Sequence, residues 1–198
     1  LSQSGLKVAL VEARGIAHGA TGRNAGFILQ GTAERYNRAI EQLGREKAHL
    51  IHTLSIDNHR AMRKIIESEK IECEYRKSGS LQLASSPQEE MELIESADLL
   101  LEDGFEATLL YGEELGEPYL SAGFQTGILL PEDGEIHPAL FVEEVVQRLN
   151  RNGVDVWINS PVLSIEENDG VQLQCPNGTL HCEMAVLCTN AYLPNLLS

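Results

Sequence analysis

LKVALVE at residues 6–12 and GATGRNAG at residues 19–26 are the two stretches of sequence that decide the fold. The first is an apolar run, interrupted only by Lys7 and ending in a carboxylate, which is typical of a strand buried on both faces of a parallel sheet. The preceding Ser4-Gly5 is typical of a helix end capped by glycine. We therefore expect the sequence to begin inside an α/β unit.

Glu12, at the end of this strand, occupies a position with a specific use in Rossmann domains. A carboxylate there accepts hydrogen bonds from both ribose hydroxyls of an adenosine. The small residues of 19–26 let backbone N–H groups approach an anion closely, and Thr21 adds a hydroxyl. The alternative is that Glu12 simply ends a strand at the surface, because an isolated acidic strand end is a weak motif.

Residues 32–70 have a helical pattern that Gly44 breaks into two helices. The apolar side of the second helix is expected to face the core and consists of Leu50, Ile51, Leu54, Ala61, Met62 and Ile65. His49, His52 and His59 fall on the other side, where we expect solvent. No carboxylate or thiolate converges on these histidines, so we predict no metal site.

The middle of the sequence is expected to form an antiparallel sheet with one covering helix. Short strands are predicted at 72–76 and 80–84, with further strands between 107 and 130. Ser86 and Glu89 form a capping box for a helix over 87–102. The acidic residues at the start of that helix are expected to form a solvated face: Glu89, Glu90, Glu92 and Glu95.

A second α/β segment follows the turn at 131–134. His137-Pro138 opens an amphipathic helix, with a structural or capping role for His137, and Gly153 closes the helix. Strands are predicted at 154–158, 162–166, 171–174, 179–182 and 184–188, with hairpin turns at 168–170 and 177–178.

These features, in this order, resemble the family of FAD-dependent amine and D-amino-acid oxidoreductases, which includes glycine oxidase, sarcosine oxidase and γ-glutamylputrescine oxidoreductase. The resemblance rests on 6–12, 19–26, the helix from His137 to Gly153 with Val162, and 187–192, so it covers nearly the whole sequence. It implies an FAD cofactor bound by Glu12, Thr21, Gly22, Arg23, Asn24, Ala25, Gly26, Val162, Thr189, Asn190 and Ala191.

The resemblance also implies a role for each of these positions. Glu12 would hold the adenosine ribose, and Thr21 and Gly22 would lie against the pyrophosphate or ribityl chain. Residues 23–26 would pass close to the isoalloxazine ring, and the backbone of Val162 would reach the adenine. Residues 189–191 would border the cofactor. No catalytic residue is assigned.

The expected fold class is α/β with mixed α+β character: an incomplete Rossmann-like FAD-binding domain with an inserted antiparallel-sheet substrate domain. The FAD-binding portion would contain residues 1–75 and 131–198, and the substrate-binding portion residues 76–130. The family's GxGxxG turn would lie roughly 20 to 30 residues before Leu1, and a segment covering the flavin would follow Ser198. We therefore expect this chain alone to bind FAD weakly or not at all and to have no catalytic turnover.

The resemblance implies an enzyme that oxidises a C–N bond of a small amine or amino acid by hydride transfer to flavin. One alternative is a flavoprotein domain that modifies tRNA. Another is a structural or protein-binding module without catalysis.

The composition bears on partners and location. Fifteen Lys+Arg against thirty Asp+Glu give a formal charge of -15, which argues against nucleic acid as a partner. Four cysteines without a CxxC pair indicate buried free thiols and a cytoplasmic protein. No run is long enough for a membrane span. Exposed strand edges are expected to favour a homo-oligomer.

Overall fold

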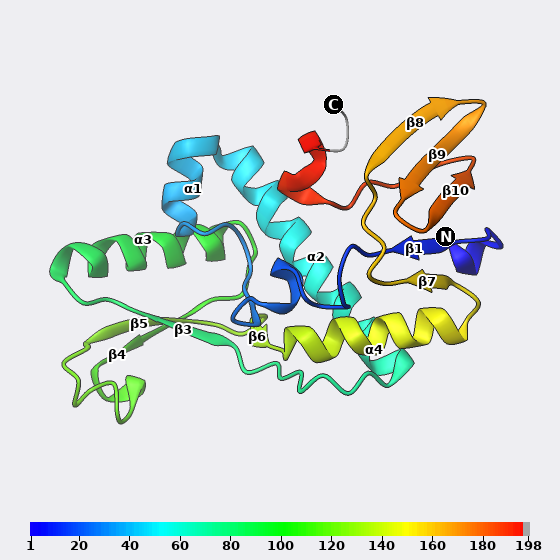
Figure 1. The fold of residues 1–198 in the computed structure, drawn as a ribbon. Helices are drawn as coiled ribbons and strands as arrows, with labels where there is room; N and C mark the ends of the chain where they lie inside the picture. The colour runs from blue at the N-terminus through cyan, green and yellow to red at the C-terminus, as the bar shows by residue number, and fades with distance from the viewer. Residues whose placement is uncertain (196–198) are drawn as a thin grey trace. The chain divides into compact units, whose positions relative to one another are not determined.

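The computed structural model describes residues 1–195, and the chain forms two compact units. Unit one contains Leu1–Asn24 and the chain from Pro138 onward, and unit two contains Ala25–His137. Both combine helices with strands, as the α/β prediction requires (Figure 1). The division into FAD-binding and substrate-binding portions at residues 75/76 and 130/131 remains a prediction about function.

Unit one contains a short parallel pair of strands, one helix and an antiparallel meander. Its elements are η1 (Ser2–Ser4), β1 (Ala9–Val11), η2 (Ala20–Gly22), α4 (Pro138–Arg151), β7 (Asp155–Trp157), β8 (Ser164–Asn168), β9 (Gly170–Cys175), β10 (Gly178–Cys182) and η4 (Asn190–Asn195). β1 pairs with β7 in parallel, with Leu10 opposite Val156. β8, β9 and β10 form the meander, so both predicted hairpins are confirmed.

Glycines end both helical segments that lead into the parallel strands. Gly5 has φ 81° and donates its backbone N–H to Ser2 O at 3.0 Å, before β1. Gly153 has φ 84° and donates to Asn150 O at 3.1 Å, before β7. Glycine adopts a left-handed backbone conformation without steric strain from a Cβ, so both helix ends could be predicted correctly from their glycines.

Unit two is built on an antiparallel sheet with helices packed against it. Its elements are β2 (Phe27–Ile28), α1 (Tyr36–Leu43), α2 (Arg45–Glu69), β3 (Ser80–Leu83), α3 (Pro87–Glu102), β4 (Thr108–Tyr111), η3 (Gly112–Leu115), β5 (Thr126–Leu130) and β6 (Gly134–Glu135). The strand order is β3-β5-β4, and β2 pairs separately with β6. The capping box is confirmed in part, since the Ser86 hydroxyl accepts the Glu89 backbone N–H at 3.2 Å.

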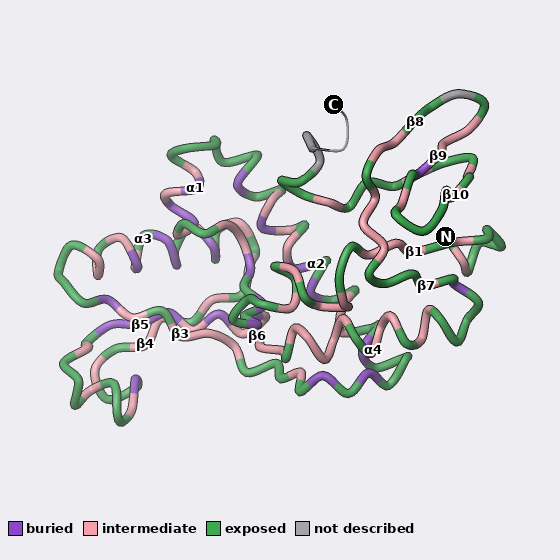
Figure 2. Tube along the Cα trace, in the orientation of Figure 1, coloured by how far each residue is buried: buried purple, intermediate pink, exposed green. Residues whose placement is uncertain are grey.

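The core of unit two lies between α1, α3 and β5. α3 contributes Leu93 and Leu100, β5 contributes Ile128 and Leu130, and Tyr36 comes from α1. Figure 2 shows the buried positions recurring along one side of α3 and along β5. Because β5 is central in its sheet and its side chains are mostly buried, this core holds the sheet to the helices.

Two predicted strands are absent from the described residues. Residues 72–76 form only an isolated bridge, in which Arg76 pairs with Glu135. Residues 184–188 have no strand assignment, and Met184 is 80% exposed. A strand requires a neighbour for its backbone hydrogen bonds, and within residues 1–195 the parallel sheet consists of β1 and β7 alone.

The predicted orientation of α2 is wrong. Leu50 and Leu54 are 56% and 58% exposed, whereas His52 and His59 are buried at 4% and 5% exposure. The imidazole of His52 packs against Phe105 with ring centroids 4.3 Å apart. A neutral imidazole is a flat ring that packs well in a core. The buried side of α2 therefore contains histidines in place of the aliphatic side chains that the pattern favoured.

The burial of His52 predicts a dependence of stability on pH. Burial, with smaller contributions from His49 and His59, lowers the pKa of His52 to about 4. Below pH ~6.5 the His52 imidazole binds a proton in the unfolded chain but stays neutral in the folded chain. The free energy of unfolding therefore falls as the pH drops from ~6.5 to ~4, by about 3 kcal/mol from this residue. Chemical denaturation across this range should show the loss, and His52→Phe should remove that part of it.

A control for this experiment is His181→Phe, which replaces an exposed histidine of β10. It should leave the pH profile of stability as in the wild type. An unchanged slope in His52→Phe would show that another group causes the pH dependence.

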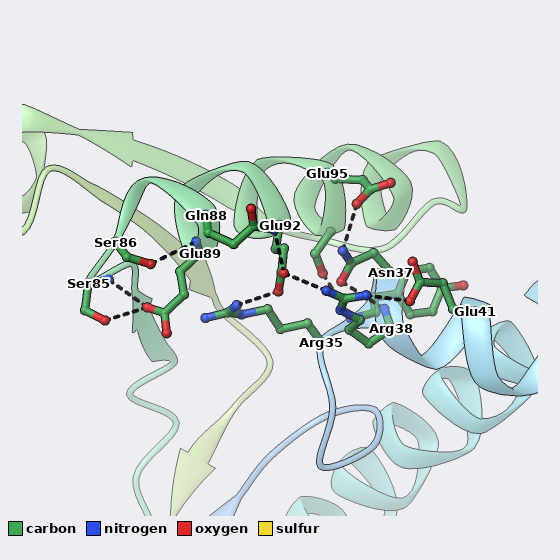
Figure 3. A network of polar contacts seen from close by, with 12 residues as sticks. Arg35, Asn37, Arg38, Glu41, Ser85, Ser86, Gln88, Glu89, Glu92 and Glu95 are labelled. Atoms are coloured by element: carbon green, nitrogen blue, oxygen red, sulfur yellow. Dashed lines mark hydrogen bonds and ion pairs between the residues drawn. The ribbon is translucent and has the colours of Figure 1, made fainter.

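The acidic start of α3 is not a purely solvated face. Figure 3 shows Glu92 between two guanidinium groups of unit two, 3.3 Å from Arg35 Nη1 and 2.6 Å from Arg38 Nη2. Glu95 accepts a hydrogen bond from Asn37 Nδ2 at 2.8 Å. These contacts join α3 to α1, so the prediction that these glutamates only meet solvent is wrong.

Candidate cofactor site

Glu12 follows β1 directly and is held by backbone contacts on both sides. Its N–H donates to Trp157 O at 2.8 Å, and its carbonyl accepts the Ser160 N–H at 2.9 Å. Its Oε1 accepts the Arg14 backbone N–H at 2.9 Å. The half-buried carboxylate is therefore fixed at the carboxyl end of the parallel strand, the edge at which α/β sheets bind ligands.

The loop after Glu12 is a compact turn closed by its own backbone. Gly22 N–H donates to Gly19 O at 3.3 Å, and Arg23 N–H donates to Ala20 O at 3.1 Å. Asn24 Nδ2 donates to Thr21 O at 2.7 Å, which ties the predicted residues 21–24 together. The structure thus brings these four positions together in and directly after η2.

Gly22 is the position in this turn that admits no side chain. A Cβ built on it would lie 2.1 Å from Ala17 O and 2.7 Å from Ala17 Cβ. Backbone at these distances cannot be accommodated without moving the chain. The glycine is required by close approach of two parts of the loop, whatever ligand the loop binds.

Ala25 and Gly26 belong to unit two, unlike the other predicted cofactor residues. Gly26 is buried and has φ 77°. Its carbonyl accepts the Ile136 N–H at 2.9 Å, and β2 follows it immediately. This end of the predicted loop is therefore part of the β2–β6 pair.

The remaining predicted residues lie in unit one. Val162 is half-buried just before β8, and Ser160 joins this part of the chain to Glu12. Asn190 and Ala191 are exposed in η4, next to Thr189. The Thr189 Oγ1 is buried and has no hydrogen-bond partner among the described residues. Because such a group costs about 1–3 kcal/mol when unpaired, it fits a polar ligand beside residues 189–191.

Asp133 is a residue whose importance the sequence did not reveal. It is 1% exposed, and its Oδ1 accepts the Gln30 N–H at 2.8 Å while its Oδ2 accepts the Ser80 hydroxyl at 2.6 Å. Burial raises the pKa of Asp133, and the hydrogen bonds from Ser80 and Gln30 oppose that rise. An aspartate before glycine is ordinary in a turn, so its type alone does not distinguish a buried anchor.

Residues 1–195 contain no group of three His, Cys, Asp or Glu side chains placed to hold a metal ion. None of the helices described combines the length and apolar character needed to cross a lipid bilayer.

Known proteins resemble this chain over its whole length. The probable oxidoreductase OrdL of Haemophilus influenzae is 26% identical over 196 residues, which cover 98% of this chain and 45% of that protein. The γ-glutamylputrescine oxidoreductase of Escherichia coli is 24% identical over 194 residues, which cover 98% and 45% respectively. The chain thus spans about half the length of these relatives.

Solved structures share the fold. The glycine oxidase from Geobacillus kaustophilus superposes with a TM-score of 0.84 at 18% identity, covering 99% of this chain and 52% of that one. The L-proline dehydrogenase from P. horikoshii superposes with a TM-score of 0.75 at 17% identity, covering 98% and 49%.

The family comparison agrees with the strand, turn and loop described above. The model of the family described as FAD dependent oxidoreductase matches residues 1–198. The match confirms the resemblance found in the sequence and makes FAD the expected cofactor. The chain belongs to the FAD-dependent oxidoreductase (DAO) family.

Proposed function

We propose that the full-length protein oxidises a C–N bond of a small amine or amino acid with FAD as its cofactor. The observation that carries the proposal is the carboxylate of Glu12, fixed at the carboxyl end of β1 and followed by the turn that only glycine at position 22 allows. The substrate class is supported by the names of the relatives, which include a γ-glutamylputrescine oxidoreductase, a glycine oxidase and an L-proline dehydrogenase.

Each predicted residue has a proposed task in holding the cofactor. Glu12 accepts hydrogen bonds from the adenosine ribose hydroxyls. Thr21 and Gly22 contact the pyrophosphate or ribityl chain, and the backbone of Val162 contacts the adenine. Thr189 supplies its unpaired hydroxyl to the cofactor, beside Asn190 and Ala191.

Residues 23–26 complete the proposed set. Arg23, Asn24, Ala25 and Gly26 would lie near the isoalloxazine ring. The bound flavin would supply the redox chemistry by accepting a hydride from the substrate carbon that bears the nitrogen. The task of this chain is to bind and orient the cofactor, so no separate nucleophile or metal is required of it.

A flavin experiment on the full-length protein tests this function. The protein should purify yellow, and its visible flavin absorbance should bleach anaerobically when a small amine or amino acid is added. A panel of glycine, proline, D-amino acids and polyamine derivatives identifies the substrate class. Protein that takes up no FAD, or bound flavin that no member of the panel reduces, would contradict the proposal.

Glu12→Gln should weaken FAD binding by about ten- to a hundredfold, because hydrogen bonds to a charged acceptor contribute about 1.5–3 kcal/mol. Titration of apo-protein with FAD, followed by flavin fluorescence, measures the change. Glu166→Gln is the matched control, since it removes the same charge from an exposed position on β8 of the same unit. Equal FAD affinity in the two variants would show that Glu12 does not contribute to the cofactor site.

Charge and thiols support the proposed partners and location. The net charge of -15 supports a small-molecule substrate and argues against nucleic acid. No disulfide joins Cys73, Cys175, Cys182 and Cys188, which supports a reducing, cytoplasmic environment, although only Cys73 is buried as predicted. Self-association through exposed strand edges stays a prediction, testable by light scattering.

A further inference from the structure

Residues 133–137 of unit two are hydrogen-bonded along both edges. On one edge, Gly134 pairs with Ile28, Glu135 pairs with Phe27, and Ile136 N–H donates to Gly26 O at 2.9 Å. This edge therefore fixes residues 26–28, which directly follow the predicted cofactor loop.

The other edge of the same segment is bonded to residues 73–79. Asp133 O accepts the Gly79 N–H, Glu135 exchanges two hydrogen bonds with Arg76, and His137 N–H donates to Cys73 O, each at 2.9 Å. A Cβ on Gly134 would lie 2.5 Å from Arg76 O. The backbones are in close contact here. Residues 133–137 therefore hold residues 26–28 in a fixed position relative to residues 73–79.

The side chain of Asp133 adds a second connection of the same kind. One carboxylate oxygen accepts the backbone N–H of Gln30 at 2.8 Å, and the other accepts the hydroxyl of Ser80 on β3 at 2.6 Å. Asp133 is only 1% exposed, so its carboxylate oxygens are shielded from bulk water and both hydrogen bonds lie in a low-dielectric environment. A single buried carboxylate thus joins the chain after the cofactor loop to the sheet of unit two.

The neighbouring acid in the turn has different partners. Glu132 contacts Arg63 Nη2 at 2.6 Å and Lys77 Nζ at 2.8 Å. These contacts tie the turn to α2 and to the chain before β3 and do not involve residues 25–30. The two adjacent acids therefore have separable roles within one turn.

We propose that Asp133 is a positioning residue for the cofactor: by holding Gln30 to Ser80, it fixes the backbone of residues 25–30 where Ala25 and Gly26 meet the bound flavin. This inference rests on the proposed function. Asp133 acts only through this backbone and does not itself touch the flavin or the substrate.

The test compares three variants of the full-length protein: Asp133→Ala, Asp133→Asn and Glu132→Gln. FAD affinity and the visible spectrum of the bound flavin are measured, with the melting temperature of the apo-protein as a separate readout. Asp133→Ala should weaken FAD binding by about tenfold and shift the flavin absorbance bands. Asp133→Asn should restore much of the affinity, because its amide oxygen can still accept the Gln30 N–H.

Glu132→Gln is the matched control for a purely structural effect. It should lower the melting temperature while leaving the spectrum of the bound flavin and its affinity as in the wild type. If Asp133→Ala fails to fold, Ser80→Ala removes one of the two partners and should produce a smaller shift in the same direction.

The outcomes separate this inference from the proposed function. A wild-type protein that binds no FAD overturns both. A wild type that binds FAD, with Asp133 variants whose flavin spectrum and affinity are unchanged, overturns the positioning role alone.

Discussion

Gly22→Ala in the full-length protein should reduce FAD affinity by about tenfold or more. The added methyl would lie 2.1 Å from Ala17 O, a backbone atom that cannot rotate away. Relieving such overpacking costs about 1–3 kcal/mol. The η2 turn must open, which displaces the backbone N–H groups of Gly22 and Arg23 that close it. Isothermal titration of the apo-protein with FAD measures the loss.

Gly19→Ala is the control for this substitution. It adds the same methyl three positions earlier in the same loop, where the nearest atom would be Arg14 Nη2 at 3.9 Å. Gly19 has φ -89°, which alanine adopts freely. Its FAD affinity should stay within about twofold of the wild type, as for a surface substitution. Similar losses in both variants would mean that the loop responds to composition and not to the contact with Ala17.

Local features of this fold could be predicted because their causes are local. The stops at Gly5, Gly44 and Gly153, the cap at Ser86 and the hairpin turns each depend on residues within a few positions of one another. All appear in the structure where the sequence placed them. The family resemblance rested on the order of four segments, namely 6–12, 19–26, the helix from His137 to Gly153 with Val162, and 187–192, and the family match confirms it.

The orientation of α2 could not be predicted because the helix carries two competing stripes. Leu50 and Leu54 form the more apolar stripe, but Ala48, Ile56 and Ile66 form another, interspersed with His52 and His59. Periodicity scores imidazoles as polar, whereas a neutral imidazole packs as a flat ring. The aromatic neighbours of His52 come from α1 and from Phe105, far away in sequence, so nothing local to α2 shows which stripe is buried.

The same limit applies to strands and to the candidate site. Residues 184–188 have the composition of a strand, but pairing depends on a neighbour that lies elsewhere in the chain. Asp133 reads as a turn residue because its partners, Gln30 and Ser80, are 103 and 53 positions away. Glu12 could be placed at the end of its strand because that position depends on the neighbouring apolar residues, and its role toward the cofactor stays a prediction. The sequence therefore revealed residues at element ends better than residues that connect elements.

Leu93→Ala should be the most destabilising of the substitutions considered for unit two. Leu93 is 0% exposed and belongs to the cluster that joins α3 to Ile128 and Leu130 of β5. Removing a fully buried leucine side chain costs about 2–5 kcal/mol, because apolar burial is lost and a cavity remains. In a domain of roughly 150–250 residues, that corresponds to a fall in melting temperature of roughly 5–15 °C.

Leu101→Ala separates burial from composition, because it makes the same change in the same helix at a side chain that is 52% exposed. It should cost less than about 1 kcal/mol. Calorimetry of the full-length apo-protein compares the two variants without any contribution from bound flavin. If Leu101→Ala were as destabilising as Leu93→Ala, α3 would not pack on β5 through the face that contains Leu93. The sheet that carries Ser80 would then lack the support on which the anchoring of residues 25–30 depends.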